Sequence, residues 1–345
     1  MPDGTSITRA TLANATGIEV DVISYGGIIT RLLVPDARGR LADIVLGLDS
    51  LEEYLSPNPY LGALIGRYGN RIAHGRFELD GKTYRLDRND GAHHLHGGVQ
   101  GFDKKNWLME TFESGSRAGV VMTLTSPDGD QGYPGRVDIR AVYELSNADE
   151  LELTLHATTD KPTIVNLTQH SYFNLAGRGD VLDHRLQIGS EIYIPVGADQ
   201  IPTGELQRVA ASPFDFRRPK AIGHDIEADH EQLRRGSGYD HTFVLKTQAN
   251  EDLMLAARVA EPVSGRVLEV LTVEPGLHFY SGNGLVGDLQ GKGRVLSRHG
   301  GFCLEPQHFP DSPNQAGFPS VTLLPDATYQ SRVLYRFSAM RSGWS

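Results

Sequence analysis

The stretch RFELDGKTYRL, residues 76–86, predicts a β-hairpin and, with it, the class of the fold. Apolar side chains alternate with polar ones on both sides of a central turn, at Phe77, Leu79, Tyr84 and Leu86. Asp80-Gly81 suits the tight turn that joins two antiparallel strands. Because successive side chains of a strand point to opposite faces, this period of two predicts a hairpin with one buried face.

The same period returns along the chain on both sides of this hairpin. It recurs in the segments IEVDVISY, GVVMTLTS, VDIRAVYELS, ELELTLHATT and VLEVLTVE. Helical spacing is confined to DSLEEYL, where Asp49 or Ser50 can cap the first turn, and HEQLRRG, which ends at Gly236. Strands without interleaved helices disfavour a parallel α/β sheet. The fold is therefore predicted to be all-β, a large antiparallel β-sandwich or barrel.

The composition is typical of a globular protein. The 345 residues are 39% hydrophobic and 22% charged, which is enough apolar material for a core. Neither a Pro/Ser linker nor a strong internal repeat divides the sequence, so we expect a single domain over residues 1–345. The net charge of −10 comes from scattered charges without a basic block, which makes nucleic acid a poor partner.

Cysteine content and apolar runs bear on location. Cys303 is the only cysteine, which excludes an intrachain disulfide and a thiolate zinc cluster. The sequence contains no run of about 18 apolar residues, and its N-terminus lacks the apolar core of a signal peptide. We therefore expect no membrane association and a cytoplasmic protein.

The segment TQHSYFNLAG, residues 168–177, combines a histidine with groups that suit a polyhydroxylated ligand. His170 is a candidate proton donor, because the imidazole titrates near neutral pH. Hydrogen-bonding and aromatic groups surround it, namely Asn166, Gln169, Ser171, Tyr172, Phe173 and Asn174. Aromatic rings of this kind can cover the C–H face of a sugar. The alternative is a structural histidine buried at the end of a strand.

A second histidine cluster lies in NDGAHHLHGGVQGFDKKNW, residues 89–107. An H-x-H pair on a strand could bind a metal, but the carboxylate that normally completes such a site does not follow. We therefore predict no metal and interpret His96 as a hydrogen-bonding site residue. Gly97 allows the backbone to bend or a ligand to approach closely, and His93 and His94 are expected to be exposed turn residues.

Three further segments offer polar side chains. In GRYGNRIAHGRF, residues 66–77, Arg67 is expected to form a solvated or structural salt bridge, whereas Asn70-Arg71 could clamp a sugar. In GGFCLEPQHFPDSPN, residues 300–314, apolar neighbours could desolvate Glu305 and make it a base near pH 7. In GYDHTF, residues 238–243, Asp240 either accepts hydrogen bonds from ligand hydroxyls or forms a turn.

Taken together and in this order, LHGG with GFDKKNW, TQHSYFNLAG, GYDHTF and EPQHFPDSPN resemble the aldose 1-epimerase family, the galactose mutarotases. The resemblance extends from about Tyr25 to Leu334. It implies a galactose-mutarotase-like β-sandwich of large antiparallel sheets with an open cleft. It also implies an isomerase that interconverts the α and β anomers of a free monosaccharide, such as D-galactose or D-glucose, without a cofactor.

The resemblance also implies roles for individual residues. Glu305 matches the proton acceptor and His170 the proton donor, with His96 the first alternative for the acid. The positions that match sugar contacts are Asn70, Arg71, His96 and Asp240, and Tyr172 is expected to line the same site. His278, in EPGLHFYSGN, stands where relatives often carry Gln, so its contact with the sugar is an open question.

Two other functions could use the same side chains. A noncatalytic carbohydrate-binding protein would need the aromatic rings and amides but not the basicity of Glu305. A glycosidase could pair Glu305 with a second carboxylate such as Asp240, because cleavage of a glycosidic bond generally needs two carboxyl groups.

Overall fold

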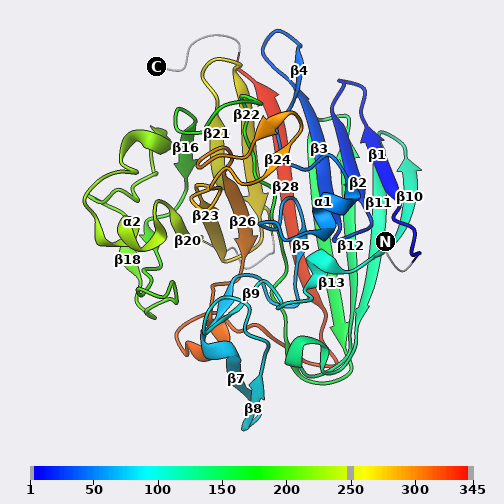
Figure 1. The fold of residues 1–345 in the computed structure, drawn as a ribbon, viewed down its shortest axis with the longest axis vertical. Coiled ribbons are helices and arrows are strands. Elements are labelled where there is room, and N and C mark those ends of the chain that lie inside the picture. The colour runs from blue at the N-terminus through cyan, green and yellow to red at the C-terminus, as the bar shows by residue number, and fades with distance from the viewer. Residues whose placement is uncertain (1–3, 247–251, 341–345) are drawn as a thin grey trace.

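A computed structural model of the chain describes residues 4–246 and 252–340, and within them β-strands dominate (Figure 1). The largest sheet has nine strands in the order β10-β11-β12-β13-β28-β22-β21-β16-β19. Their bounds are β10 Leu108–Ser114, β11 Arg117–Ser126, β12 Val137–Ser146, β13 Glu150–Thr159, β16 Arg185–Ile188, β19 Lys220–Ala221, β21 Met254–Ala260, β22 Arg266–Thr272 and β28 Tyr329–Ala339.

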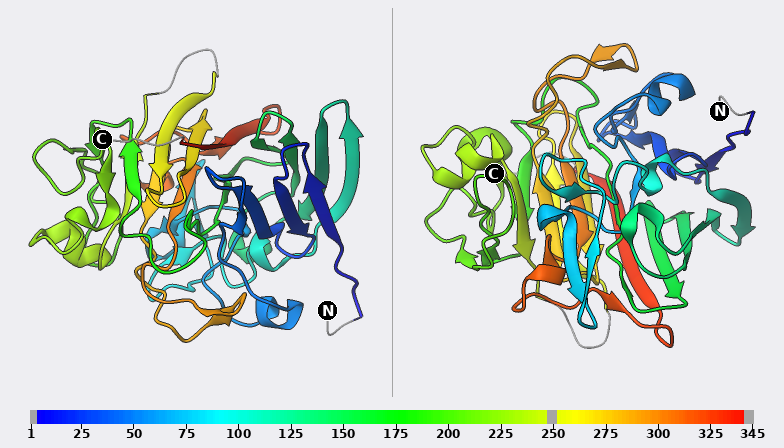
Figure 2. Two further views of the ribbon diagram at one scale, coloured as in Figure 1. Left: turned by 90° about the horizontal axis from the view of Figure 1, so that it is seen from above. Right: turned by 60° about the horizontal axis from the view of Figure 1, so that its bottom comes forward.

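Two smaller sheets pack against this nine-stranded sheet. A four-stranded sheet contains β1 Arg9–Ala13, β2 Glu19–Ile23, β3 Ile28–Pro35 and β4 Leu41–Asp43. A five-stranded sheet, in the order β18-β17-β20-β23-β26, contains β17 Ile192–Tyr193, β18 Gln207–Arg208, β20 Asp240–Val244, β23 Gly276–Tyr280 and β26 Cys303–Gln307. Figure 2 shows from two further directions how these smaller sheets face the large one.

Short ribbons and helical turns complete the described residues. The two-stranded ribbons pair β5 Leu64–Ile65 with β15 Thr168–Gln169, β6 Arg71–Ile72 with β9 His94–Leu95, β7 Arg76–Leu79 with β8 Lys82–Arg85, β14 Thr163–Ile164 with β27 Thr322–Leu323, and β24 Gln290–Gly291 with β25 Arg294–Val295. The α-helices are α1 Leu51–Leu55 and α2 Glu231–Gly236. The 3-10 turns are Ala73–Gly75, Phe102–Lys104, Asp130–Gly132, Ile222–His224 and Ser312–Asn314.

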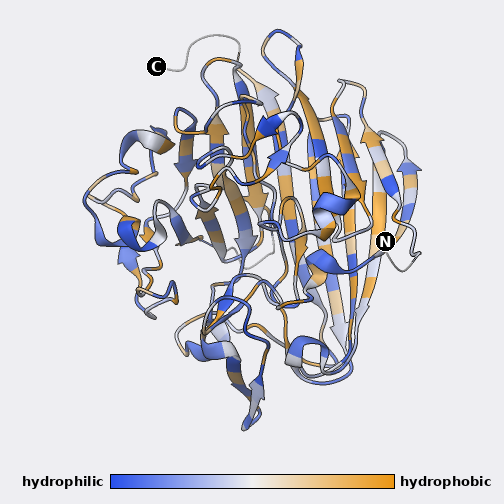
Figure 3. Cartoon of the chain, in the orientation of Figure 1, coloured by the Kyte–Doolittle hydropathy of each residue, from blue (hydrophilic) through white to orange (hydrophobic). Residues whose placement is uncertain are grey.

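One large hydrophobic core joins the sheets. Val22 of the four-stranded sheet, Met122 and Val270 of the nine-stranded sheet and Phe279 of the five-stranded sheet all belong to one cluster of buried side chains. Hydrophobic and hydrophilic residues alternate along many of the strands in Figure 3, as the two-residue period predicts. The core therefore fills the space between the sheets, because each sheet turns its apolar face inward.

The structure confirms the predicted hairpin and the two predicted helical segments. The hairpin forms from β7 and β8 around Asp80-Gly81, with Phe77 buried. Ser50 is the N-cap of α1 and forms a capping box with Glu53, and α2 ends at Gly236. No helix among residues 4–246 and 252–340 is long and apolar enough to cross a membrane.

Candidate active site

The five-stranded sheet turns one face to the core and presents polar side chains on the other. Thr242 of β20 lies directly opposite His278 of β23, which lies directly opposite Glu305 of β26. Directly opposed residues of antiparallel strands project from the same face, so these three side chains form a row across the sheet. The alternate positions, such as Phe279 and Leu304, are buried in the core.

A cavity of ≈ 180 Å³ lies over this polar face. It is lined by Pro59, Tyr60, Asn70, Arg71, Leu95, His96, His170, Tyr172, Asp240, His278, Tyr280 and Glu305. The cavity thus brings together every residue that the family resemblance assigned to the site, from segments that are up to 235 residues apart, counted from Asn70 to Glu305. A larger hollow of ≈ 480 Å³ on the nine-stranded sheet, lined by β10 to β13 and Asn106, contains none of them.

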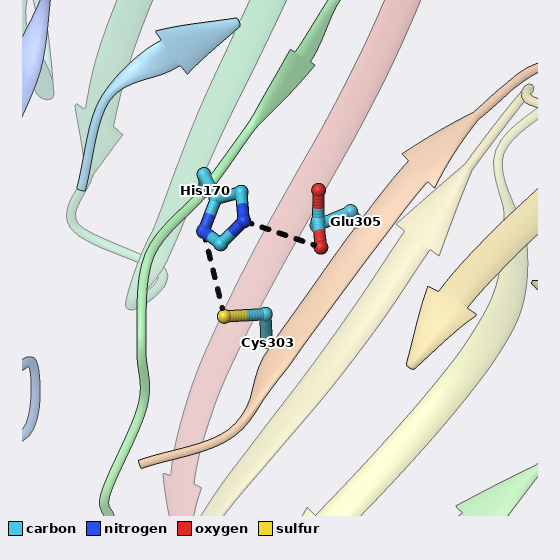
Figure 4. Close-up of side chains that lie close together, drawn as sticks. All are labelled: His170, Cys303 and Glu305. Carbon is cyan, nitrogen blue, oxygen red and sulfur yellow. Dashed lines mark hydrogen bonds and ion pairs between the residues drawn. The ribbon is translucent and has the colours of Figure 1, made fainter. Parts of the chain in front are cut away.

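His170 and Glu305 form an imidazole–carboxylate pair at the wall of the cavity. His170 follows the short strand β15, and its Nε2 lies 3.7 Å from Oε1 of Glu305 (Figure 4). Both side chains are almost completely buried, and Oε2 of Glu305 has no hydrogen-bond partner among the described residues. A carboxyl group and an imidazole ring therefore face the same small space.

Cys303 lies on the other side of the His170 ring. Its Sγ is 3.6 Å from Nδ1 of His170, and it projects from β26 on the same face as Glu305 (Figure 4). The ligand atoms of His170, Cys303 and Glu305 lie within 4.8 Å of one another, which is close enough to consider a metal ion. Burial, with the nearby Glu305 carboxylate, raises the pKa of the Cys303 thiol well above its ordinary value, as for a cysteine in apolar surroundings.

His96 enters the cavity from the turn that follows β9. The backbone N–H of Asn70 donates to its Nδ1 (3.2 Å), so the neutral ring carries its proton on Nε2. Burial, followed by the positive charges of His170 and Arg71, holds the pKa of His96 well below 6.5. His96 is thus a neutral hydrogen-bond donor near pH 7. The neighbouring Gly97 (φ +85°) leaves room for the backbone of Gly66, where a Cβ would collide with its carbonyl oxygen.

Arg71 is anchored beside the cavity by an ion pair. Its Nε donates to Oδ2 of Asp90 (2.7 Å), and its backbone N–H donates to Oδ1 of Asn70 (2.9 Å). The arginine side chain is 15% exposed. Because Nε is used by Asp90, the two terminal amino groups of the guanidinium can serve a ligand.

Asp240 and His278 form a largely buried pair in the wall of the cavity. Nε2 of His278 lies 2.7 Å from Oδ1 of Asp240, and Nδ1 lies 2.9 Å from the hydroxyl oxygen of Thr242. Burial acts to raise the pKa of Asp240, but the hydrogen bond from His278 and the charge of Arg71 hold it below its ordinary value. Asp240 is therefore an ionised acceptor and not merely a turn former.

Several polar residues in TQHSYFNLAG and just before it serve the fold and not the cavity. The amide of Gln169 donates to the carbonyl oxygen of Gly62 and to Ser171. Asn174 similarly donates to the carbonyl oxygen of Gly300. The amide of Asn166 donates to the backbone carbonyl oxygens of Gly69 and His308. The prediction that these groups hydrogen-bond a ligand is not supported, because nearby backbone groups occupy them.

Two predictions in the neighbouring segments are wrong. His93 and His94 are buried; His94 contacts Tyr133 and the carbonyl oxygen of Asp87, and burial lowers its pKa to about 4. Within the part of the chain that the structure describes, Arg67 forms no salt bridge. It is 2% exposed, and its guanidinium donates to backbone carbonyl groups such as that of Pro134.

The cavity also contains two aromatic residues that the sequence analysis missed. The ring of Tyr60 lies 4.6 Å from that of His96, and Tyr280 packs against Tyr172. Tyr280 could have been found, because it lies two residues after His278 and so shares its face of β23. Tyr60 lies in a loop, where periodicity gives no signal.

The family follows from comparison with known proteins. The family model described as aldose 1-epimerase matches residues 8–336, nearly the whole chain. The chain belongs to the aldose 1-epimerase family. It is 43% identical to the galactose mutarotase of Bos taurus over 98% of this chain and 96% of the bovine one. It is 38% identical to the aldose 1-epimerase of Escherichia coli K12 over 98% and 97% of the two chains.

A solved structure agrees with the fold of this aldose 1-epimerase family member. The galactose 1-epimerase of Lactobacillus acidophilus superposes with a TM-score of 0.87 at 32% identity, covering 98% of this chain and 96% of that one. The predicted galactose-mutarotase-like β-sandwich is confirmed, and so is the predicted isomerase. Mutarotase activity, the interconversion of the anomers of an aldose, follows from membership of the family.

Proposed function

We propose that this mutarotase acts on free hexoses such as D-galactose and D-glucose, with Glu305 as the proton acceptor and His170 as the proton donor. The observation that carries the proposal is the 3.7 Å separation of His170 Nε2 and Glu305 Oε1 at the wall of one cavity. The relatives named galactose mutarotase and galactose 1-epimerase support the choice of sugar.

The chemistry requires two proton transfers at neighbouring atoms. Ring opening removes the proton of the anomeric hydroxyl and adds a proton to the ring oxygen, and both oxygens are bonded to the same carbon. A carboxylate and an imidazolium placed close together can serve both atoms at once. Rotation about the bond to the free aldehyde carbon, followed by the reverse transfers, closes the ring as the other anomer. No group is consumed, and a cofactor is not needed.

The remaining residues of the cavity suit sugar binding. Arg71 and Asn70 offer donors, Asp240 offers an ionised acceptor, and His96 offers a neutral N–H. Tyr172 lies beside His170, with the ring centroids 5.1 Å apart, where it can cover an apolar face of the sugar. The roles of these residues, like those of the acid–base pair, are part of the proposal.

Polarimetry tests the substrate. Freshly dissolved α-D-galactose, α-D-glucose and L-arabinose are followed with and without enzyme, each against its spontaneous rate. We expect acceleration with the hexoses. Spontaneous rates for both hexoses at micromolar enzyme would contradict the proposed substrate. The cytoplasmic location expected from the sequence stays a prediction.

A further inference from the structure

Both ring nitrogens of His278 are used within the protein. Nδ1 faces the hydroxyl of Thr242 at 2.9 Å, and Nε2 faces Oδ1 of Asp240 at 2.7 Å. The residue is only 5% exposed. His278 therefore lines the cavity with the edge of its ring, while both of its hydrogen-bonding atoms are bound toward strand β20.

For a neutral imidazole ring, the ionised carboxylate of Asp240 fixes the direction of these hydrogen bonds. An ionised carboxylate can only accept, so the Nε2 that faces Asp240 must carry the proton. In the neutral ring Nδ1 is then an acceptor, and Thr242 must donate its hydroxyl proton to it. The chain of donors runs from Thr242 through His278 to Asp240, and it leaves Oδ2 of Asp240 for a ligand hydroxyl.

We propose that His278 is a positioning residue that acts on the sugar through Asp240, and that Thr242 holds it in the tautomer required for this. The hydrogen bond from Thr242 to Nδ1 keeps the proton on Nε2 of His278. The hydrogen bond from Nε2 holds the carboxylate of Asp240 in place, and Asp240 accepts a hydrogen bond from a sugar hydroxyl. The inference rests on the proposed function only in its last step, the contact between Asp240 and the sugar. The first two steps are properties of the free protein.

The strand geometry explains why this arrangement is stable. Thr242 and His278 are directly opposed on β20 and β23, and Asp240 lies two residues before Thr242 on the same face. All three side chains therefore stand on one rigid sheet and not on loops. Glu305 of β26 lies directly opposite His278 on the other side of β23. His278, which supports Asp240, and the proposed base Glu305 are therefore neighbours on one face of the sheet.

The test uses Thr242→Val, which keeps the shape but removes the hydroxyl, and Thr242→Ser, which keeps the hydroxyl. Loss of one hydrogen bond in the chain should raise KM for galactose about three- to tenfold in Thr242→Val, with kcat within about twofold. Thr242→Ser should remain near wild type. An unchanged KM in Thr242→Val, or a fall in kcat at constant KM, would overturn the proposal.

Nitrogen NMR of the histidine rings gives an independent readout on the free protein. The signal of His278, assigned by its loss in His278→Gln, should show the proton on Nε2 in wild type and in Thr242→Ser. Thr242→Val should give a mixture of tautomers. A proton on Nδ1 in wild type would overturn the proposal even if Thr242→Val fails to fold. If the tautomers are as expected but Asp240→Asn leaves KM unchanged, the proposed contact between Asp240 and the sugar is wrong instead.

Discussion

Arg71→Ala should weaken sugar binding far more than it slows the chemistry. Asp90 holds Nε of Arg71 at 2.7 Å and leaves the terminal amino groups to the cavity. A hydrogen bond that involves a charged group contributes about 1.5–3 kcal/mol. Since about 1.4 kcal/mol corresponds to a factor of ten in binding, KM should rise about 10- to 150-fold. The guanidinium of Arg71 is expected to contact the substrate and the transition state equally, so kcat should change by no more than about threefold.

The assay is coupled or polarimetric mutarotation over a range of galactose concentrations, with Arg76→Ala as the matched control because Arg76 is exposed on the adjoining strand β7. Asp90→Asn should raise KM by a smaller factor, since it loosens the guanidinium without removing it. A fall of more than about tenfold in kcat at an unchanged KM would refute the reasoning and place Arg71 on the transition state.

Three further outcomes can be measured. Activity should survive prolonged chelation and dialysis, and a loss with EDTA that a divalent ion restores would show that a metal is required. Arg67→Met should lower the free energy of unfolding by about 3 kcal/mol or more in urea titrations, because it leaves buried carbonyl groups such as that of Pro134 without a donor; a change below about 1 kcal/mol would contradict this role. Burial acts to lower the pKa of His308, but Glu274 raises it overall, so this pair stabilises the fold below about pH 6.5 and loses its effect as the pH rises through the folded pKa. The free energy of unfolding of wild type should therefore fall more steeply with rising pH than that of His308→Gln. An equal pH dependence in the two proteins would show that the His308–Glu274 pair does not stabilise the fold.

Alternation along the strands predicted much of the fold, because the period of two is a local property. The hairpin around Asp80-Gly81 and strands such as β12 and β13 formed where the pattern placed them. Strand order could not be derived in this way. For example, β28 inserts between β13 and β22, and no local pattern specifies that neighbour. The single domain predicted over residues 1–345 stays a prediction.

The site was predicted from motifs more completely than from physical reasoning. The residues implied by the family resemblance all line one cavity. By contrast, Arg67 was misassigned because its partners, such as Ser126 and Pro134, come from distant segments that the sequence does not place. His94 was expected to be exposed because a turn usually is, but Tyr133 covers it from 39 residues away. Long-range packing, invisible in a local window, explains these errors.

The most direct test of the central claim is the rate of α-D-galactose mutarotation by Glu305→Gln. Glutamine keeps the shape of the side chain but cannot act as a base, so kcat should fall by about 100-fold or more while KM stays within a few-fold of wild type. Glu110→Gln, an exposed change on strand β10, is the matched control. His170→Asn should behave like Glu305→Gln, and the double variant should lose far less than the product of the two losses, because either change alone disables the concerted transfer. Near-normal mutarotation by Glu305→Gln would contradict the account.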